Sequence, residues 1–351
     1  MIPLILHPNP MKTLFKSLFI NPADNLCMAM RKTIFHFLRK KKALILRRLL
    51  LNLNKNTNDR YSCIPVMDAN PWLITGASVT GNGHRKEGEL CQDAHYAQVW
   101  KNGWGVAIVS DGAGTASKSH LTSALLVKKA AENAQGLVER MGWAEENVLP
   151  TREQWAHHAI SFMHSMQKSV FSFAGLHAID RADLHATLIV VIFSPIGLLV
   201  THIGDGRAGC RDKQGNYHSL ITPWEGEQAG QTVFITTDPV HFNKIVGISM
   251  FDKPADAFFI LTDGCENVAW QTLNKNTETG VFEKKNKPFQ PFWEQTIRTI
   301  RNMHKTLSSE QTGRNWYNYL HGGHKAFVIE TDDKTMVTGI FTENQNHPHA
   351  H

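Results

Sequence analysis

The sequence predicts an α+β protein in which antiparallel sheets are covered on the outside by helices. Two observations lead to this fold class. The β-rich segments come mostly in hairpin pairs, such as residues 96–99 and 105–110 around a turn at residues 101–103. The helical patterns form a group of their own, at residues 117–141 and 152–173. This grouping differs from the strict strand–helix alternation that is typical of a parallel sheet.

Each predicted element has its own local pattern. Leu121, Leu125, Ala131 and Ala134 recur at helical spacing within residues 117–141. The second helix carries a stripe of large apolar residues that we interpret as core: Trp155, Phe162, Met166 and Val170. Segments rich in β-branched and aromatic residues predict the strands. The strands are expected at 73–79, 96–99, 105–110, 186–193, 198–203, on both sides of 212–216, at 258–262 and at 335–341, and a third helix at 290–304.

Composition excludes several classes of protein. Of the 351 residues, 42% are hydrophobic and 19% are charged, so the chain can build a core and is not disordered throughout. No stretch of 18 uncharged apolar residues is present, so no membrane-spanning helix is expected. The five cysteines are scattered and never form a CxxC pair. This pattern argues against a disulfide framework or a zinc ribbon, and it predicts a reducing, cytoplasmic location.

The basic residues are concentrated at the start of the chain. Residues 1–66 contain 12 Lys and Arg against 2 Asp and Glu, whereas the remainder contains 25 against 29. Residues 28–53 read as a basic amphipathic helix. We favour a disordered leader or a mis-called translation start, with contact to an anionic membrane surface as the alternative, and expect no nucleic-acid partner. The domain is predicted at 67–342, followed by a polar, His-containing tail at 343–351.

Four aspartates follow β-rich runs or lie at tight turns. Asp111 lies in AIVSDGAG, Asp205 in THIGDGRAG, Asp263 in FILTDGCEN and Asp332 in ETDDKTMV. A single Asp-Gly pair is usually a plain turn. Three pairs at the ends of buried strands are a stronger signal, because a carboxylate there is costly unless something neutralises it. Oxygen ligands without a Cys or His pattern select Mg²⁺ or Mn²⁺.

These motifs, in this order, resemble those of the metal-dependent Ser/Thr protein phosphatases of type 2C, in a compact bacterial form. The opening segment GASVTGNGHRKEGELCQDA, the Ala-Thr strand HATLIVVIF and the aspartate motifs above carry the resemblance. It runs from about Ile74 to Phe341. The resemblance implies a four-layer α-β-β-α sandwich of two antiparallel sheets flanked by helices.

The resemblance also implies roles for individual residues. Asp111 would bridge two Mn²⁺ or Mg²⁺ ions, and the Gly112 carbonyl would bind one of them. Asp263 and Asp332 would hold the other ion. Asp205 would help to bind a third, weaker ion.

The implied reaction is hydrolysis of phosphoserine and phosphothreonine in proteins by a metal-activated water. Asp93 would support this water, and together with Asp111 it forms the implied catalytic pair. The implied partner is a phosphorylated protein, the product of a Ser/Thr kinase. Two cations about 3.5–4 Å apart suit this chemistry because they lower the pKa of a shared water and clamp phosphoryl oxygens.

The sequence departs from the family pattern at the position of the phosphate-binding residue. Gly88 stands where many members have Arg, so His84 or Arg85 is predicted to bind the substrate instead. Ala113 replaces a His that protonates the leaving group in some relatives, which leaves water or His84 for that role. The alternative interpretation is a catalytically weak or inactive regulatory module with the phosphatase fold.

A second alternative is a nucleotide-binding P-loop. Residues 112–119 follow a predicted strand and precede a predicted helix, as a phosphate-binding loop does. However, Ser117 replaces the Gly that this motif needs before Lys118, and the motif leaves Asp263 and Asp332 without a role.

Overall fold

The computed structural model describes residues 61–67, 70–224, 232–275 and 282–342. The chain divides into two units, Met1–Asn52 and Leu53–His351, and every described residue belongs to the second. The predicted leader is therefore described only from Tyr61 onward, and the predicted tail at 343–351 lies outside the described residues. Among the described helices, none is long and apolar enough to span a membrane.

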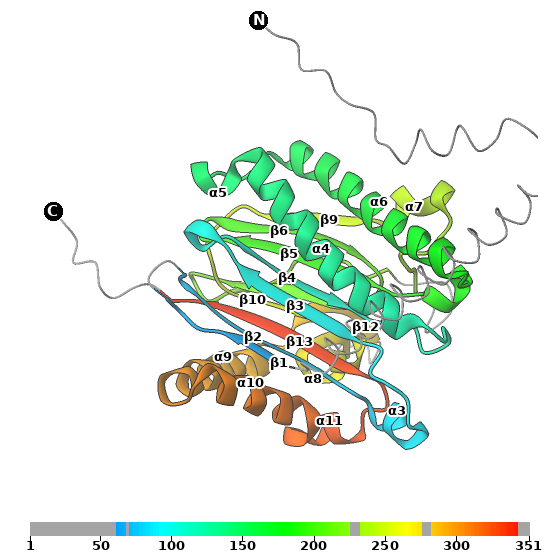
Figure 1. Ribbon diagram of the computed structural model, residues 1–351. Coiled ribbons are helices and arrows are strands. Elements are labelled where there is room, and N and C mark those ends of the chain that lie inside the picture. The colour runs from blue at the N-terminus through cyan, green and yellow to red at the C-terminus, as the bar shows by residue number, and fades with distance from the viewer. Residues whose placement is uncertain (1–60, 68–69, 225–231, 276–281, 343–351) are drawn as a thin grey trace, which may run out of the picture. The chain divides into compact units, whose positions relative to one another are not determined.

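Two antiparallel sheets form the centre of the described unit (Figure 1). The six-stranded sheet has the order β1 (Tyr61–Ile64), β2 (Trp72–Val79), β13 (Lys334–Phe341), β10 (Ala255–Leu261), β7 (Arg207–Asp212) and β8 (Tyr217–Ser219). The five-stranded sheet has the order β3 (Ala94–Val99), β4 (Gly105–Ser110), β5 (Leu188–Ser194), β6 (Gly197–Ile203) and β9 (Gly247–Phe251). A separate hairpin joins β11 (Trp270–Lys275) to β12 (Phe282–Pro288).

Helices cover the outer face of each sheet (Figure 1). The five-stranded sheet is covered by α4 (Ser119–Met141) and α6 (Arg152–His177), and the six-stranded sheet by α9 (Gln290–Thr306), α10 (Ser309–Asn318) and α11 (Lys325–Ile329). Short helices are α3 (Asn82–Glu87), α5 (Trp143–Glu146), α7 (Pro239–Ile245) and α8 (Glu266–Ala269). Single turns are η1 (Lys101–Gly103), η2 (Arg181–Leu184), η3 (Asp263–Cys265) and η4 (Tyr319–Gly323).

Local sequence explains where α6 and α10 begin. Thr151 caps α6 because its hydroxyl accepts from the Gln154 N–H while the Gln154 side chain accepts from the Thr151 N–H. Ser308 and Gln311 form the same reciprocal cap on α10. Such capping boxes satisfy backbone groups that a helix end leaves unpaired.

The core has three layers. Between the sheets, the Trp72 ring meets Phe193 and Phe258 with ring centroids 5.2 and 5.3 Å apart. A second layer lies between the five-stranded sheet and α4 and α6, where Trp155 and Met163 are buried. The third lies under α9 and α10 and includes a 3.8 Å stack of Phe259 on Trp293. The predicted α+β sandwich of four layers is thereby confirmed.

The P-loop alternative is wrong. In that motif the loop follows a strand of a parallel sheet, whereas β4 pairs antiparallel with β3 on one side and β5 on the other. The sheet also begins before the expected domain start at Met67. Tyr61–Ile64 form β1, which pairs with residues 74–77 of β2.

Candidate metal and phosphoester site

Five aspartates lie where strands of both sheets end. The pairing of Ala94 with Ser110 puts Asp93 beside Asp111, at the same end of β3 and β4. In the other sheet, Leu261 of β10 pairs with Arg207 and with Met336. The segments that carry Asp205, Asp263 and Asp332 therefore also end together. All five were predicted from the sequence as site residues.

Electrostatic interactions connect the five carboxylates. Burial raises the pKa of Asp111 well above its usual range, and repulsion from Asp263, Asp93, Asp332 and Asp205 raises it further. Burial is also the main reason why the pKa of Asp263 rises to about 7, with repulsion from Asp332 and Asp205 added. Removing a carboxylate from water and placing other carboxylates beside it both disfavour its charged form. The cluster consequently favours any species that supplies positive charge.

Asp93 is buried, and one of its two carboxylate oxygens accepts a hydrogen bond. The Thr262 hydroxyl donates to Asp93 Oδ2 over 2.7 Å. Burial raises the pKa of Asp93, as does the charge of Asp333, whereas the Thr262 hydrogen bond lowers it. Among the described residues, Asp93 Oδ1 and Asp263 Oδ1 are buried and have no hydrogen-bond partner. Two unpartnered carboxylate oxygens next to other carboxylates are free to accept a cation.

The donor set fits a hard divalent cation. All the clustered groups offer oxygen, which Mg²⁺ and Mn²⁺ prefer. Among the described residues, no three His, Cys, Asp or Glu side chains already converge in a geometry that could hold a metal ion. Asp111 and Asp263 lie close enough for the charge of Asp263 to raise the pKa of Asp111. Small side-chain rotations would therefore have to accompany the binding of a cation.

Asp333, which the sequence analysis did not assign to the site, fixes the opening loop. Its Oδ1 accepts from the Gly81 N–H over 2.7 Å, and its Oδ2 accepts from the Gln92 N–H over 2.5 Å. Its Oδ1 also lies 3.0 Å from His84 Nδ1. Asp333 is 1% exposed, whereas Asp332 is the most exposed of the clustered aspartates. The two adjacent aspartates therefore differ in role: Asp333 holds the backbone of the opening loop, and Asp332 faces the cluster.

Of the two predicted substrate-binding residues, only His84 lies at the cluster. A Cβ atom on Gly114, in the loop that follows Asp111, would lie 3.9 Å from His84 Nε2. Burial lowers the pKa of His84, but its hydrogen bond with Asp333 and the charges of Asp333, Asp332 and Glu89 outweigh burial and raise it. A protonated imidazole at this position could meet a phosphate oxygen or donate a proton.

Arg85 is directed to other partners. Its Nη2 donates to Asn82 Oδ1 over 2.6 Å, and its Nη1 contacts His321 Nε2 in η4. The structure therefore places Arg85 in a small polar group formed by α3 and η4. A role for Arg85 in phosphate binding would require it to leave these contacts.

Further residues hold the aspartate loops in place. The Arg207 guanidinium pairs with Glu266 over 2.7 Å, which ties the loop of Asp205 to that of Asp263. The Asp111 N–H donates to Thr187 Oγ1 over 3.1 Å. These contacts cross between strands, so no pattern within one segment of sequence could have revealed them.

Comparisons with known proteins agree with this fold. The family model described as protein phosphatase 2C matches residues 80–311. Serine/threonine-protein phosphatase 3 of Escherichia coli (strain K12) is 27% identical over 218 residues, which cover 60% of this chain and 80% of that protein. In fold, the chain is similar to a crystal structure of a bacterial serine phosphatase variant, with a TM-score of 0.50 and 12% identity over 78% of this chain and 98% of that one. Because the family model matches more than half of its length, the chain belongs to the protein phosphatase 2C family.

Proposed function

We propose that the protein hydrolyses phosphoserine and phosphothreonine esters in proteins by attack of water, with divalent cations held by the aspartate cluster. The observation that carries the proposal is that Asp111 and four other aspartates, from separate segments of the chain, lie where strands of both sheets end. Carboxylates that lie this close together repel one another and lower the stability of the folded protein. Such a destabilising cluster points to a functional site. Family membership supports the same reaction.

The cations would be Mn²⁺ or Mg²⁺. Asp111 and the Gly112 carbonyl would hold one, Asp111, Asp263 and Asp332 the other, and Asp205 a third, weaker ion. When bound, such cations lower the pKa of a water molecule and neutralise the phosphoryl oxygens.

The other residues of the site position groups and move protons. Asp93, fixed by Thr262, offers its unpartnered Oδ1 as a hydrogen-bond acceptor that can orient the attacking water. His84, whose pKa is raised, can donate a proton to the leaving serine or threonine oxygen. In this account the site forms no covalent bond with phosphate, because water and not a side chain is the nucleophile.

The partner would be a phosphoprotein made by a Ser/Thr kinase, in a reducing cytoplasmic compartment. Cys63, Cys210 and Cys265 are free thiols, as that compartment would allow. The basic charge of residues 1–66 would add weak contact with an anionic membrane surface.

Release of inorganic phosphate from a phosphoserine peptide tests the proposal. We expect release by the purified chain with Mn²⁺ and none after EDTA. The alternative is a regulatory module with this fold and little turnover, which Gly88 favours because the usual phosphate-gripping Arg is missing there. Phosphopeptide binding without phosphate release would establish that alternative.

A further inference from the structure

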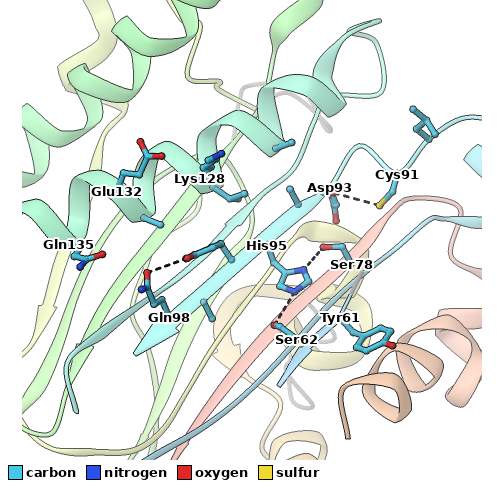
Figure 2. Close-up of a pocket in the computed structure, with 17 residues that line it drawn as sticks. Tyr61, Ser62, Ser78, Cys91, Asp93, His95, Gln98, Lys128, Glu132 and Gln135 are labelled. Atoms are coloured by element: carbon cyan, nitrogen blue, oxygen red, sulfur yellow. Dashed lines mark hydrogen bonds between the residues drawn. The ribbon is translucent and has the colours of Figure 1, made fainter. Parts of the chain in front are cut away.

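A cavity of about 560 Å³ lies between helix α4 and strands β1 to β3 (Figure 2). Its walls are residues 61–62 of β1, Ser78 of β2, the loop that ends at Asp93, residues 94–98 of β3 and one face of α4. Its volume falls within the range of sites that bind ligands in proteins, about 300–1,000 Å³.

The cavity follows the edge of β3. Five consecutive residues, Ala94 to Gln98, line it. Because successive side chains of a strand point to opposite faces, a cavity that touches all five runs along the edge of the strand and not over one face. β3 is the terminal strand of its sheet, and no described strand pairs with its outer side. Such an edge presents backbone N–H and C=O groups that can pair with another extended chain.

The lining carries little net charge. At its centre, His95 Nδ1 lies 2.8 Å from the Ser78 hydroxyl, and His95 Nε2 lies 3.2 Å from that of Ser62. Burial lowers the pKa of His95 to about 4, so the ring is neutral at physiological pH. On α4, the exposed Lys128 and Glu132 carry opposite charges. The remaining α4 residues of the wall are small or apolar, apart from Gln135: Ala124, Val127 and Ala131. The groove therefore suits a peptide backbone with uncharged side chains.

One end of this groove reaches Asp93 of the candidate site. Asp93 lines it, and the pairing of Ala94 with Ser110 sets that end beside Asp111. The six residues of β3 span roughly 20 Å in extended conformation. A chain that leaves the carboxylate cluster along β3 would extend about six residues beyond the phosphorylated one.

We propose that the edge groove of β3 receives an extended segment of the phosphoprotein substrate, which pairs its backbone with β3 while the phosphorylated residue lies at the aspartate cluster. This inference rests on the proposed phosphatase function. It adds a substrate class: phosphorylation sites in unstructured chain, with an uncharged segment on one side. Addition of a strand to an open sheet edge is a known mode of peptide recognition.

Peptide length tests the proposal with the full chain. The probes are a short phosphoserine peptide and two versions extended by six small uncharged residues, one before and one after the phosphoserine. We expect one extension to lower KM about tenfold at unchanged kcat, as one or two added backbone hydrogen bonds would. Backbone N-methylation at alternate residues of that extension should abolish the gain. Equal KM values for all three peptides would overturn the proposal.

Substitutions in the groove provide the second test. Two variants, Gln98→Trp and Gln135→Trp, each add a large side chain to one wall of the groove. The matched control is Gln214→Trp, in the exposed turn between β7 and β8. This turn lies at the opposite end of the six-stranded sheet from β1. Both groove variants should raise the KM of the extended peptide to that of the short one. They should not change turnover of a small aryl phosphate, and the control should behave like the parent protein.

The two proposals fail in different ways. Absence of aryl phosphate turnover with Mn²⁺ would contradict the phosphatase function. Normal aryl phosphate turnover, together with an extended-peptide KM that neither groove variant changes, would contradict only the docking groove. Fluorescence anisotropy of the labelled extended peptide measures docking without turnover. Binding that both groove variants weaken and the control retains would support the groove by itself.

Discussion

The Gln92 N–H donates to Asp333 Oδ2 over 2.5 Å, although the two residues lie 241 positions apart in the chain. The same carboxylate accepts from the Gly81 N–H. One buried side chain thus attaches both ends of the opening segment, residues 81–92, to the start of β13. This attachment adds to the pairing of Ala94 with Ser110, which puts Asp93 beside Asp111.

Asp333→Ala is expected to lower the free energy of unfolding by about 2–4 kcal/mol, because it leaves two buried backbone N–H groups without acceptors. Asp333→Asn should cost less, since its side-chain oxygen can still accept one of these bonds. Urea unfolding measures the change. Glu87→Ala, at an exposed position of α3, is the control. A stability equal to that of the control would show that Asp333 does not hold the loop.

Metal-free protein should lose stability as the pH rises from about 4 to 7. The pKa of Asp263 is about 7 in the folded state, mainly through burial, and aspartate in an unfolded chain titrates near 4. Between these values the folded state binds more protons than the unfolded state, so the free energy of unfolding falls as the pH rises. Thermal unfolding in EDTA at pH 5 and pH 7.5 measures this.

Two changes should flatten that pH dependence. Asp263→Asn removes the titrating group, and millimolar Mn²⁺ replaces the proton with a cation. Glu87→Gln, at the exposed position in α3, should leave the dependence as it is. If the metal-free protein is equally stable at both pH values, the carboxylates do not repel each other as described.

His84→Gln should lower kcat most for substrates that have a poor leaving group. An alkyl phosphate such as phosphoserine needs a proton on its departing oxygen, whereas a nitrophenolate leaves without one. We therefore expect kcat to fall at least tenfold for a phosphoserine peptide and less than threefold for p-nitrophenyl phosphate. Steady-state kinetics on both substrates measure the difference. Equal losses on the two substrates would indicate that His84 binds phosphate and is not the proton donor.

Strand β1 determines how far the chain can be shortened from its N-terminus without loss of stability. We expect a chain that begins at Leu53 to keep its stability and its phosphatase activity, and to lose salt-sensitive binding to anionic vesicles. A chain that begins at Met67 also lacks β1, including Tyr61, whose ring lies 6.3 Å from Tyr317. It should therefore unfold at a lower urea concentration. Identical unfolding curves would mean that β1 adds nothing to the domain.

Much of the fold could be predicted because the long elements have strong periodic patterns. Strands β4 and β5 are buried on both faces and read as continuous apolar runs, as do residues 257–261 of β10. Helices α4 and α6 show clear apolar stripes. In contrast, the sequence analysis did not predict β1 and β9. Both are half-buried edge strands of four and five residues, which are too short for a periodic pattern to stand out.

The site was partly predictable for a similar reason. Asp111, Asp205 and Asp263 each stand in an Asp-Gly pair after a strand, and this local signal places them at strand ends. The roles of Thr262 and Asp333 come from contacts with residues far away in the chain, so no local signal marks them. The contact of Arg85 with His321 likewise joins segments far apart in the chain, so the sequence near Gly88 does not reveal it.

The central claim is that the aspartate cluster works only with a divalent cation. The most direct measurement is phosphate release from a phosphoserine peptide by EDTA-stripped protein while Mn²⁺ is added back, for the parent chain and for Asp111→Asn. We expect no release without metal, saturable recovery with Mn²⁺ in the parent chain, and recovery lower by orders of magnitude in the folded variant. Full release by the stripped protein, or equal recovery in Asp111→Asn, would contradict it.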